Sequence, residues 1–224
     1  MPPIYKPTTG PEDWKQFLAK PDLHWKSGYF AKSMAYCWEK ADGLPEEIAM
    51  AIRLQWDIEP EPLIIIPEYK VPLPGGGADS QNDAFLFCRI GEQTAAVMIE
   101  GKVDEPFGPS IGEWLKQASA GKIKRLQHLC ALLGVSYPPA PHLRYQLFHR
   151  AASAIIEAER FGADLAIMIV HSFSPKRAWH EDFSAFAAEL GTADKAGALP
   201  RAMSVPGRPF HLGWVAGNPE YLTR

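Results

Sequence analysis

The sequence predicts an α/β protein whose mixed β-sheet is flanked by helices, with an α+β arrangement as the close alternative. Segments of strand character occupy 63–103, and the last two are separated only by Gly91-Glu92, which suits a two-residue type II′ hairpin turn. A long amphipathic segment, 143–161, then precedes the apolar run 163–170, which is typical of a strand buried on both faces. A strand reached through a long helix after a hairpin implies a mixed sheet.

With 224 residues, 46% of them hydrophobic, the chain is expected to form one domain with its own core. We divide residues 1–224 into a helical segment (1–60), a central core (61–175) and a C-terminal helix and tail (176–224). No apolar run approaches the length of a membrane span, and the first seven residues lack a signal-peptide core, so we expect a cytoplasmic protein without membrane contact. Cys37, Cys88 and Cys130 are too widely spaced for a zinc knuckle and odd in number, which argues against a disulfide framework.

The elements follow from periodicity and punctuation. Ala31, Met34, Ala35 and Trp38 recur at helical spacing, and Glu59-Pro60-Glu61-Pro62 ends a second short helix over 46–56. Strands are expected over 63–66, 69–73, 83–90 and 93–103, with prolines marking the first two as irregular or edge positions. The remaining segments are expected as helices (110–118, 122–133, 143–161 and 181–190), a buried strand (163–170) and an edge strand (210–215). The glycine-rich loop over 74–82 lacks the Gly-Lys-Ser/Thr ending of a P-loop.

Charge is unevenly distributed along the chain. No carboxylate occurs between Glu113 and Glu157, and that stretch holds only basic charges: Lys116, Lys122, Lys124, Arg125, Arg144 and Arg150. The segment before it, 64–113, is acidic. A basic wall beside acidic residues suits a polyanion handled with a divalent cation, and a solvated basic helix face is the alternative interpretation.

The hairpin turn fixes which side chains meet. If Gly91 and Glu92 are the two turn residues, Asp83 lies directly opposite Glu100, with Cβ atoms about 5 Å apart. Two facing carboxylates repel unless a cation lies between them, and Lys102 falls on the same face as Glu100. The alternative is a solvent-exposed hairpin end where these charges only mark the strands' emergence into water.

Asp83, a strand-turn-strand and Glu100-Gly101-Lys102 resemble the PD-(D/E)XK nuclease superfamily, with its restriction-endonuclease-like core of helix, three-strand meander, helix and strand. Asn82 stands where the family name places proline. The Tyr145-Gln146-Leu147-Phe148-His149 segment is similar to the glutamine-bearing helix of the RecB-like exonuclease branch, and Arg150 shares the polar stripe of Gln146. The family often carries an acid on its first helix, for which Glu39 is the best match and Glu46 or Glu47 the reserve.

The resemblance implies a metal-dependent nuclease that acts on nucleic acid, with DNA as the expected substrate. Asp83, Glu100 and the Gly101 carbonyl would hold Mg²⁺ or Mn²⁺, and Lys102 would activate water and stabilise the phosphate charge. Gln146 would act in the catalytic site. In this interpretation Arg150 would position the nucleic-acid strand, Lys122, Lys124 and Arg125 of the basic stretch would contact its phosphates, and a homodimer stays open.

Two other functions stay open at this point. The chain could be a catalytically inactive member of the same fold that binds nucleic acid or a protein. Gly108-Pro109-Ser110-Ile111-Gly112 also fits the G-x-S-x-G pattern of serine hydrolases, with Ser110 as the nucleophile. Against this, four residues separate the strand from this motif, and Ser110 with Glu113 has the spacing of a helix capping box.

Overall fold

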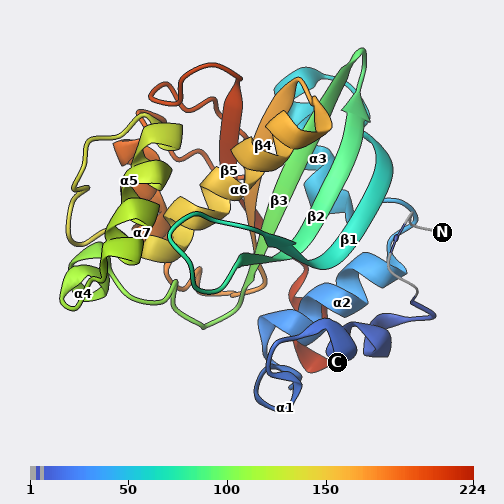
Figure 1. Cartoon of the computed structure of the whole chain (residues 1–224). Coiled ribbons are helices and arrows are strands. Elements are labelled where there is room, and N and C mark those ends of the chain that lie inside the picture. Colours follow the sequence, from blue (N-terminus) through green and yellow to red (C-terminus); the bar gives the residue numbers. More distant parts are fainter. Residues whose placement is uncertain (1–3, 6–7) are drawn as a thin grey trace.

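A computed structural model describes residues 4, 5 and 8–224 and contains one five-stranded sheet in the order β1-β2-β3-β4-β5 (Figure 1). The strands are β1 (Glu61–Val71), β2 (Ser80–Ile90), β3 (Gln93–Lys102), β4 (Leu165–Ser172) and β5 (Phe210–Ala216). β1, β2 and β3 form an antiparallel meander, and β4 and β5 add in parallel. The mixed sheet flanked by helices confirms the predicted α/β class.

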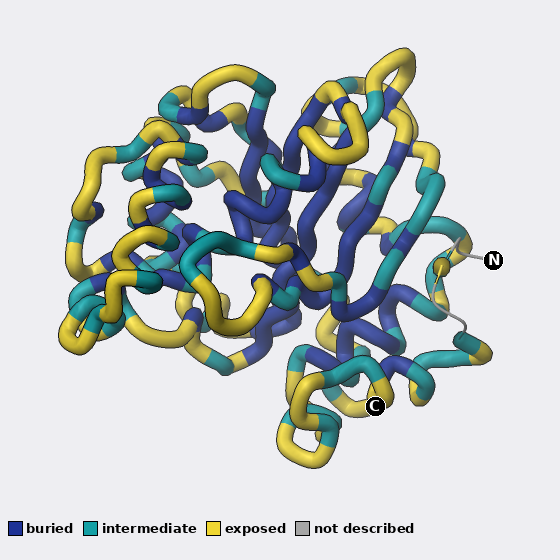
Figure 2. The backbone as a smooth tube through the Cα atoms, viewed as in Figure 1, coloured by how far each residue is buried: buried dark blue, intermediate teal, exposed yellow. Residues whose placement is uncertain are grey.

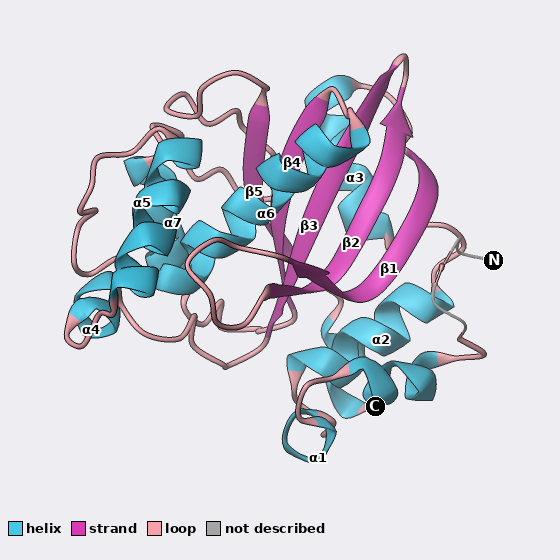
Figure 3. Ribbon diagram, in the orientation of Figure 1, coloured by secondary structure: helices cyan, strands magenta, loops and turns pink. Residues whose placement is uncertain are grey.

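Helices cover both faces of the sheet (Figure 3). The face that carries Phe85 and Met98 packs against α5 (Ala120–Leu133), α6 (Tyr145–Phe161) and α7 (His180–Glu189), with the short α4 (Ile111–Leu115) beside them. The face that carries Leu86 and Val97 packs against α2 (Phe30–Lys40) and α3 (Glu46–Trp56). The short elements η1 (Pro11–Phe17), α1 (Pro21–His24) and η2 (Pro219–Thr223) complete the chain. The central strands are buried, and so are the sides of the helices that face the sheet (Figure 2).

The hairpin between β2 and β3 has the predicted turn. Ile90 pairs with Gln93, and the same register continues to Ala84 and Ile99. Gly91 has φ +61°, and the φ of Glu92 is not positive. A positive φ at the first central residue alone is the pattern of a type II′ turn. The register prediction on which the site depends is therefore confirmed.

β1 differs from the expected pair of short strands, because it runs without a break from Glu61 to Val71. Pro67 is tolerated because β1 is the first strand of the sheet order and has β2 on one side. The register of β1 against β2 shifts between Pro62 and Ile64, and Glu68 has φ +50°, a left-handed conformation that is uncommon outside glycine. Other boundaries shift by a few residues: β2 begins at Ser80, inside the loop expected over 74–82, and the helix expected over 110–118 ends at Leu115.

Among the described residues, no helix is both long enough and apolar enough to cross a membrane.

Candidate functional site

Asp83 near the start of β2 and Glu100 near the end of β3 lie together on the face covered by α6. They come directly after the last pair of the hairpin ladder, Ala84 with Ile99, in the same register. The backbone N–H of Gly101 donates to Asp83 Oδ2 at 2.6 Å. Asp83 is 6% exposed and Glu100 1%, so the alternative of a solvent-exposed hairpin end is wrong.

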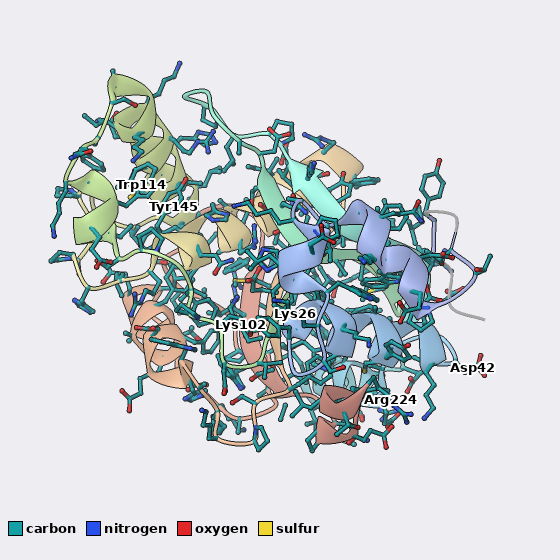
Figure 4. All side chains as sticks on the ribbon, turned by 90° about the horizontal axis from the view of Figure 1, so that it is seen from below. Lys26, Asp42, Lys102, Trp114, Tyr145 and Arg224 are labelled. Carbon is teal, nitrogen blue, oxygen red and sulfur yellow. The ribbon has the colours of Figure 1, made fainter. Side chains whose placement is uncertain are left out.

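Three side chains converge on the Glu100 carboxylate. Lys102 Nζ lies 2.5 Å and Gln146 Nε2 2.8 Å from Glu100 Oε1, and Arg150 Nε donates to Glu100 Oε2. Lys102 comes from β3 itself, whereas Gln146 and Arg150 come from the first turns of α6, four residues apart on one helix face. Lys102 is 2% exposed near the centre of the molecule (Figure 4). The predicted polar stripe of α6 therefore points into the acidic site.

The two carboxyl groups differ in their electrostatics. Burial raises the pKa of Asp83 well above its ordinary value, and the neighbouring carboxylates of Glu100 and Glu68 raise it further. Burial also acts to raise the pKa of Glu100, but Arg150 and Lys102 outweigh it and leave that pKa lowered. Glu100 is therefore a stably ionised carboxylate, and Asp83 is a carboxyl group that a further cation would favour in its charged form.

Glu68 belongs to this site and was not predicted. Its β1 neighbours Pro67 and Tyr69 pair with Ala84 and Asn82, which places Glu68 opposite Asp83. Glu68 is 6% exposed, and Gln81 Nε2 donates to Glu68 Oε2 at 2.6 Å. Glu68 could be placed opposite Asp83 only if the pairing register of β1 and β2 were known. The sequence does not define that register, because a long glycine-rich loop joins the two strands.

Gly101 owes its identity to packing on the opposite face. A Cβ atom built there would lie 2.6 Å from Met34 Sδ and 3.0 Å from a ring carbon of Phe30, both on α2. The glycine between Glu100 and Lys102 thus lets α2 pack directly beneath the site. The part of the Gly101 carbonyl in metal binding stays a prediction.

The predicted additional acid on the first helix is wrong in its placement. Glu39 lies on α2, which packs against the opposite face of the sheet, and it accepts a hydrogen bond from Trp14 Nε1 at 2.8 Å. The reserve residues are also elsewhere, because Glu46 pairs with Arg53 and Glu47 contacts His171 at 3.0 Å. Helix periodicity predicts which residues of α2 lie on the same side of the helix, but it does not predict the sheet face against which α2 packs.

The basic residues of α5 divide into two kinds. Arg125 donates to the carbonyl oxygens of Pro74 at 3.0 Å and Ala78 at 2.9 Å, so its guanidinium anchors the glycine-rich loop. This contact replaces the phosphate contact predicted for Arg125. Lys122 lies over the Trp114 ring, with Nζ 5.0 Å from its centroid, and Lys124 is exposed. Lys122 and Lys124 stay predictions as nucleic-acid contacts.

A cavity of about 390 Å³ opens beside these groups, and we call it the mouth cavity. Its lining residues are Asp79, Gln81, Pro106, Gly108, Pro109, Tyr145, Gln146, His149 and Arg150. The Tyr145 ring stacks on Trp114 with centroids 4.1 Å apart, and the two side chains lie together at one side of α6 (Figure 4). Gln146 and Arg150 both line this cavity and bond to Glu100, so these two side chains connect the cavity with the buried Glu100 carboxylate.

A second polar cluster, Cys37, Glu47 and His171, lies on the α2 and α3 side, and its ligand atoms lie within 4.8 Å of one another. Its spacing would suit a metal ion, but its hydrogen bonding does not. Trp38 Nε1, which can only donate, bonds His171 Nδ1 at 3.3 Å, so the proton sits on His171 Nε2 and points at Glu47. A metal-bound histidine needs the reverse arrangement, with its distant nitrogen donating.

Ser110 is the N-cap of α4. Its side chain accepts from the Glu113 backbone N–H at 3.2 Å, and the Glu113 carboxylate accepts from the Ser110 backbone N–H at 2.8 Å. The predicted capping box is confirmed. β3 ends at Lys102, so the strand that a nucleophile elbow requires directly before the serine does not lead into Ser110.

The chain belongs to the family described as "Domain of unknown function (DUF6946)", whose model matches residues 7–219. Neither the curated proteins nor the solved structures gave a match.

Proposed function

We propose that this protein is a metal-dependent phosphodiesterase that cleaves nucleic acid, DNA in the first place, with a site resembling that of the PD-(D/E)XK nucleases. One observation carries the proposal: Asp83, Glu100 and Lys102 share one buried side of the β2–β3 hairpin. The residues suit Mg²⁺ or Mn²⁺, which prefer oxygen ligands. The raised pKa of Asp83, caused by burial and by neighbouring carboxylates, favours a cation there.

Asp83 and Glu100 would hold the metal ion, which supplies Lewis-acid stabilisation of the phosphate when bound. The chain's own residues would orient the substrate. Lys102, Gln146 and Arg150 all donate to Glu100 in this structure, and each can turn a donor toward a phosphate oxygen that enters through the mouth cavity. Lys102 would also orient the attacking water.

The test compares cleavage of single-stranded and duplex DNA by the wild type with Mg²⁺, Mn²⁺ or EDTA. Lys102→Met keeps the side-chain volume and removes the ammonium, and it should lower cleavage by about 10²- to 10³-fold. The exposed Lys195→Met is the matched control and should cleave like the wild type. Cleavage that persists in EDTA, or equal activity of the Lys102 and Lys195 variants, would remove the proposal.

A second candidate function is a binding module without catalysis. It is favoured by the closed network around Glu100, both of whose oxygens already accept hydrogen bonds from Lys102, Gln146 and Arg150. Titration calorimetry separates the two functions. Absence of heat with millimolar Mg²⁺, together with DNA binding that does not depend on the metal, would select the binding module.

A further inference from the structure

His149 lies on α6 between the mouth cavity and the buried site, and its ring is held from one side. Nδ1 is 2.8 Å from Ser80 Oγ and 3.3 Å from Arg150 Nη1. Among the described residues, the ring's hydrogen bonds are made by Nδ1. His149 also lines the mouth cavity, and its ring lies 5.0 Å from that of Tyr145.

These contacts determine which ring nitrogen carries the proton. The Arg150 guanidinium can only donate, so the Nδ1 atom that it faces is the unprotonated acceptor. Ser80 Oγ accepts from Arg150 Nη1 at 3.2 Å, which leaves its own proton to donate to Nδ1. The proton of the neutral imidazole is therefore on Nε2.

The imidazole also stays uncharged at neutral pH. Burial lowers the pKa of His149 well below its ordinary value, and the cations Arg150, Arg125 and Lys102 lower it further. A neutral imidazole with a fixed Nε2 proton is a hydrogen-bond donor that does not release that proton. Such a donor stabilises negative charge on a phosphate oxygen without taking part in proton transfer.

From this geometry we infer that His149 Nε2–H is a substrate-binding donor, which hydrogen-bonds a non-bridging oxygen of the phosphodiester held beside Gln146 and Arg150. The inference rests on the proposed nuclease function and adds a residue to that site. Ser80 and Ser153 position the ring on its Nδ1 side. Ser80 Oγ contacts Nδ1, and Ser153 Oγ lies within hydrogen-bond distance of Ser80 Oγ at 2.9 Å and of the His149 carbonyl at 2.7 Å.

Two amide variants separate the ring's two nitrogens. His149→Gln places an amide donor near the position of Nε2, and His149→Asn keeps an acceptor near Nδ1 but no longer reaches the cavity. Both are assayed for kcat and KM on a labelled DNA oligonucleotide with Mg²⁺, and their thermal unfolding is recorded. His149→Asn should lose about 10- to 100-fold in kcat/KM, and His149→Gln should stay at least about tenfold more active than His149→Asn.

The other outcomes overturn the inference in distinguishable ways. Equal activity of both variants and the wild type would show that the Nε2 proton does not contact substrate. Equal losses that follow the loss of thermal stability would show that His149 only packs against Ser80 and Arg150. A wild type without metal-dependent cleavage would remove the proposed function, and this inference with it.

Discussion

Asp83 and Glu100 face each other in one buried site, yet the same acid-to-amide change should have opposite effects on stability in the metal-free protein. Glu100 is the shared partner of Lys102 and Arg150, and Glu100→Gln leaves two buried cations without a carboxylate. Removing one member of a buried ion pair costs about 3–5 kcal/mol. We expect Glu100→Gln to destabilise by that amount.

Asp83→Asn should instead stabilise the metal-free protein. Asp83 Oδ2 accepts from the Gly101 N–H, and an asparagine oxygen can keep this bond while removing the charge that faces Glu100. Two unit charges about 5 Å apart at an effective dielectric constant of about 20 repel by about 3 kcal/mol, which is the upper limit of the gain. We expect an increase of about 1–3 kcal/mol.

The assay is urea unfolding of both variants and the wild type in EDTA, at neutral pH and at several lower pH values. Because the pKa of Asp83 is raised in the folded state, the folded protein keeps a proton that the unfolded chain releases. Wild-type stability should therefore fall as pH rises from the ordinary aspartate pKa to the raised value, and then level off. Asp83→Asn should lack this fall, and equal signs for the two variants at neutral pH would refute the reasoning.

Four further results should follow from the structure. Gly101→Ala brings a methyl group against α2 and should cost about 1–3 kcal/mol in urea unfolding, and an unchanged midpoint would contradict that packing. Ser110→Ala removes the α4 cap and should cost about 1 kcal/mol while DNA cleavage is kept, whereas loss of all cleavage would restore a catalytic serine. Arg125→Lys should speed limited proteolysis within 74–79, because one ammonium cannot reach the separated carbonyls that the guanidinium bonds; unchanged cleavage there would remove the anchoring role. In equilibrium dialysis the wild type should bind zinc no better than Cys37→Ser, since the His171 tautomer opposes a metal, and tighter binding by the wild type would show that the tautomer changes.

Local rules predicted much of the site. The turn at Gly91-Glu92 and the two-residue alternation of strands placed Asp83, Glu100 and Lys102 on one side of the hairpin, because both depend only on residues close in sequence. The helical stripe of α6 likewise placed Gln146 and Arg150 together. The sheet face on which a distant helix packs does not depend on such local rules, and Glu39 of α2 therefore lies away from the site in which it was expected.

Contacts across long loops were also out of reach of the sequence. Glu68 enters the site through the β1–β2 register, which the glycine-rich loop of 74–79 leaves undetermined until Arg125 of α5 fixes that loop. Arg125 was expected to contact phosphate and instead anchors the glycine-rich loop, and this difference also arises from a contact between segments far apart in the sequence. The sequence shows that Arg125 is basic, but which carbonyl oxygens it contacts depends on how the loop and α5 come together in the folded protein.

By itself, the sequence determined the α/β class, the hairpin register and the capping box, because each follows from the stereochemistry of a few neighbouring residues. The tertiary structure alone decided that the acids are buried, that Lys102 and Arg150 share Glu100, and that the proton of His149 lies on Nε2. These properties depend on desolvation and on partners up to 70 positions away in the chain, which no local pattern encodes.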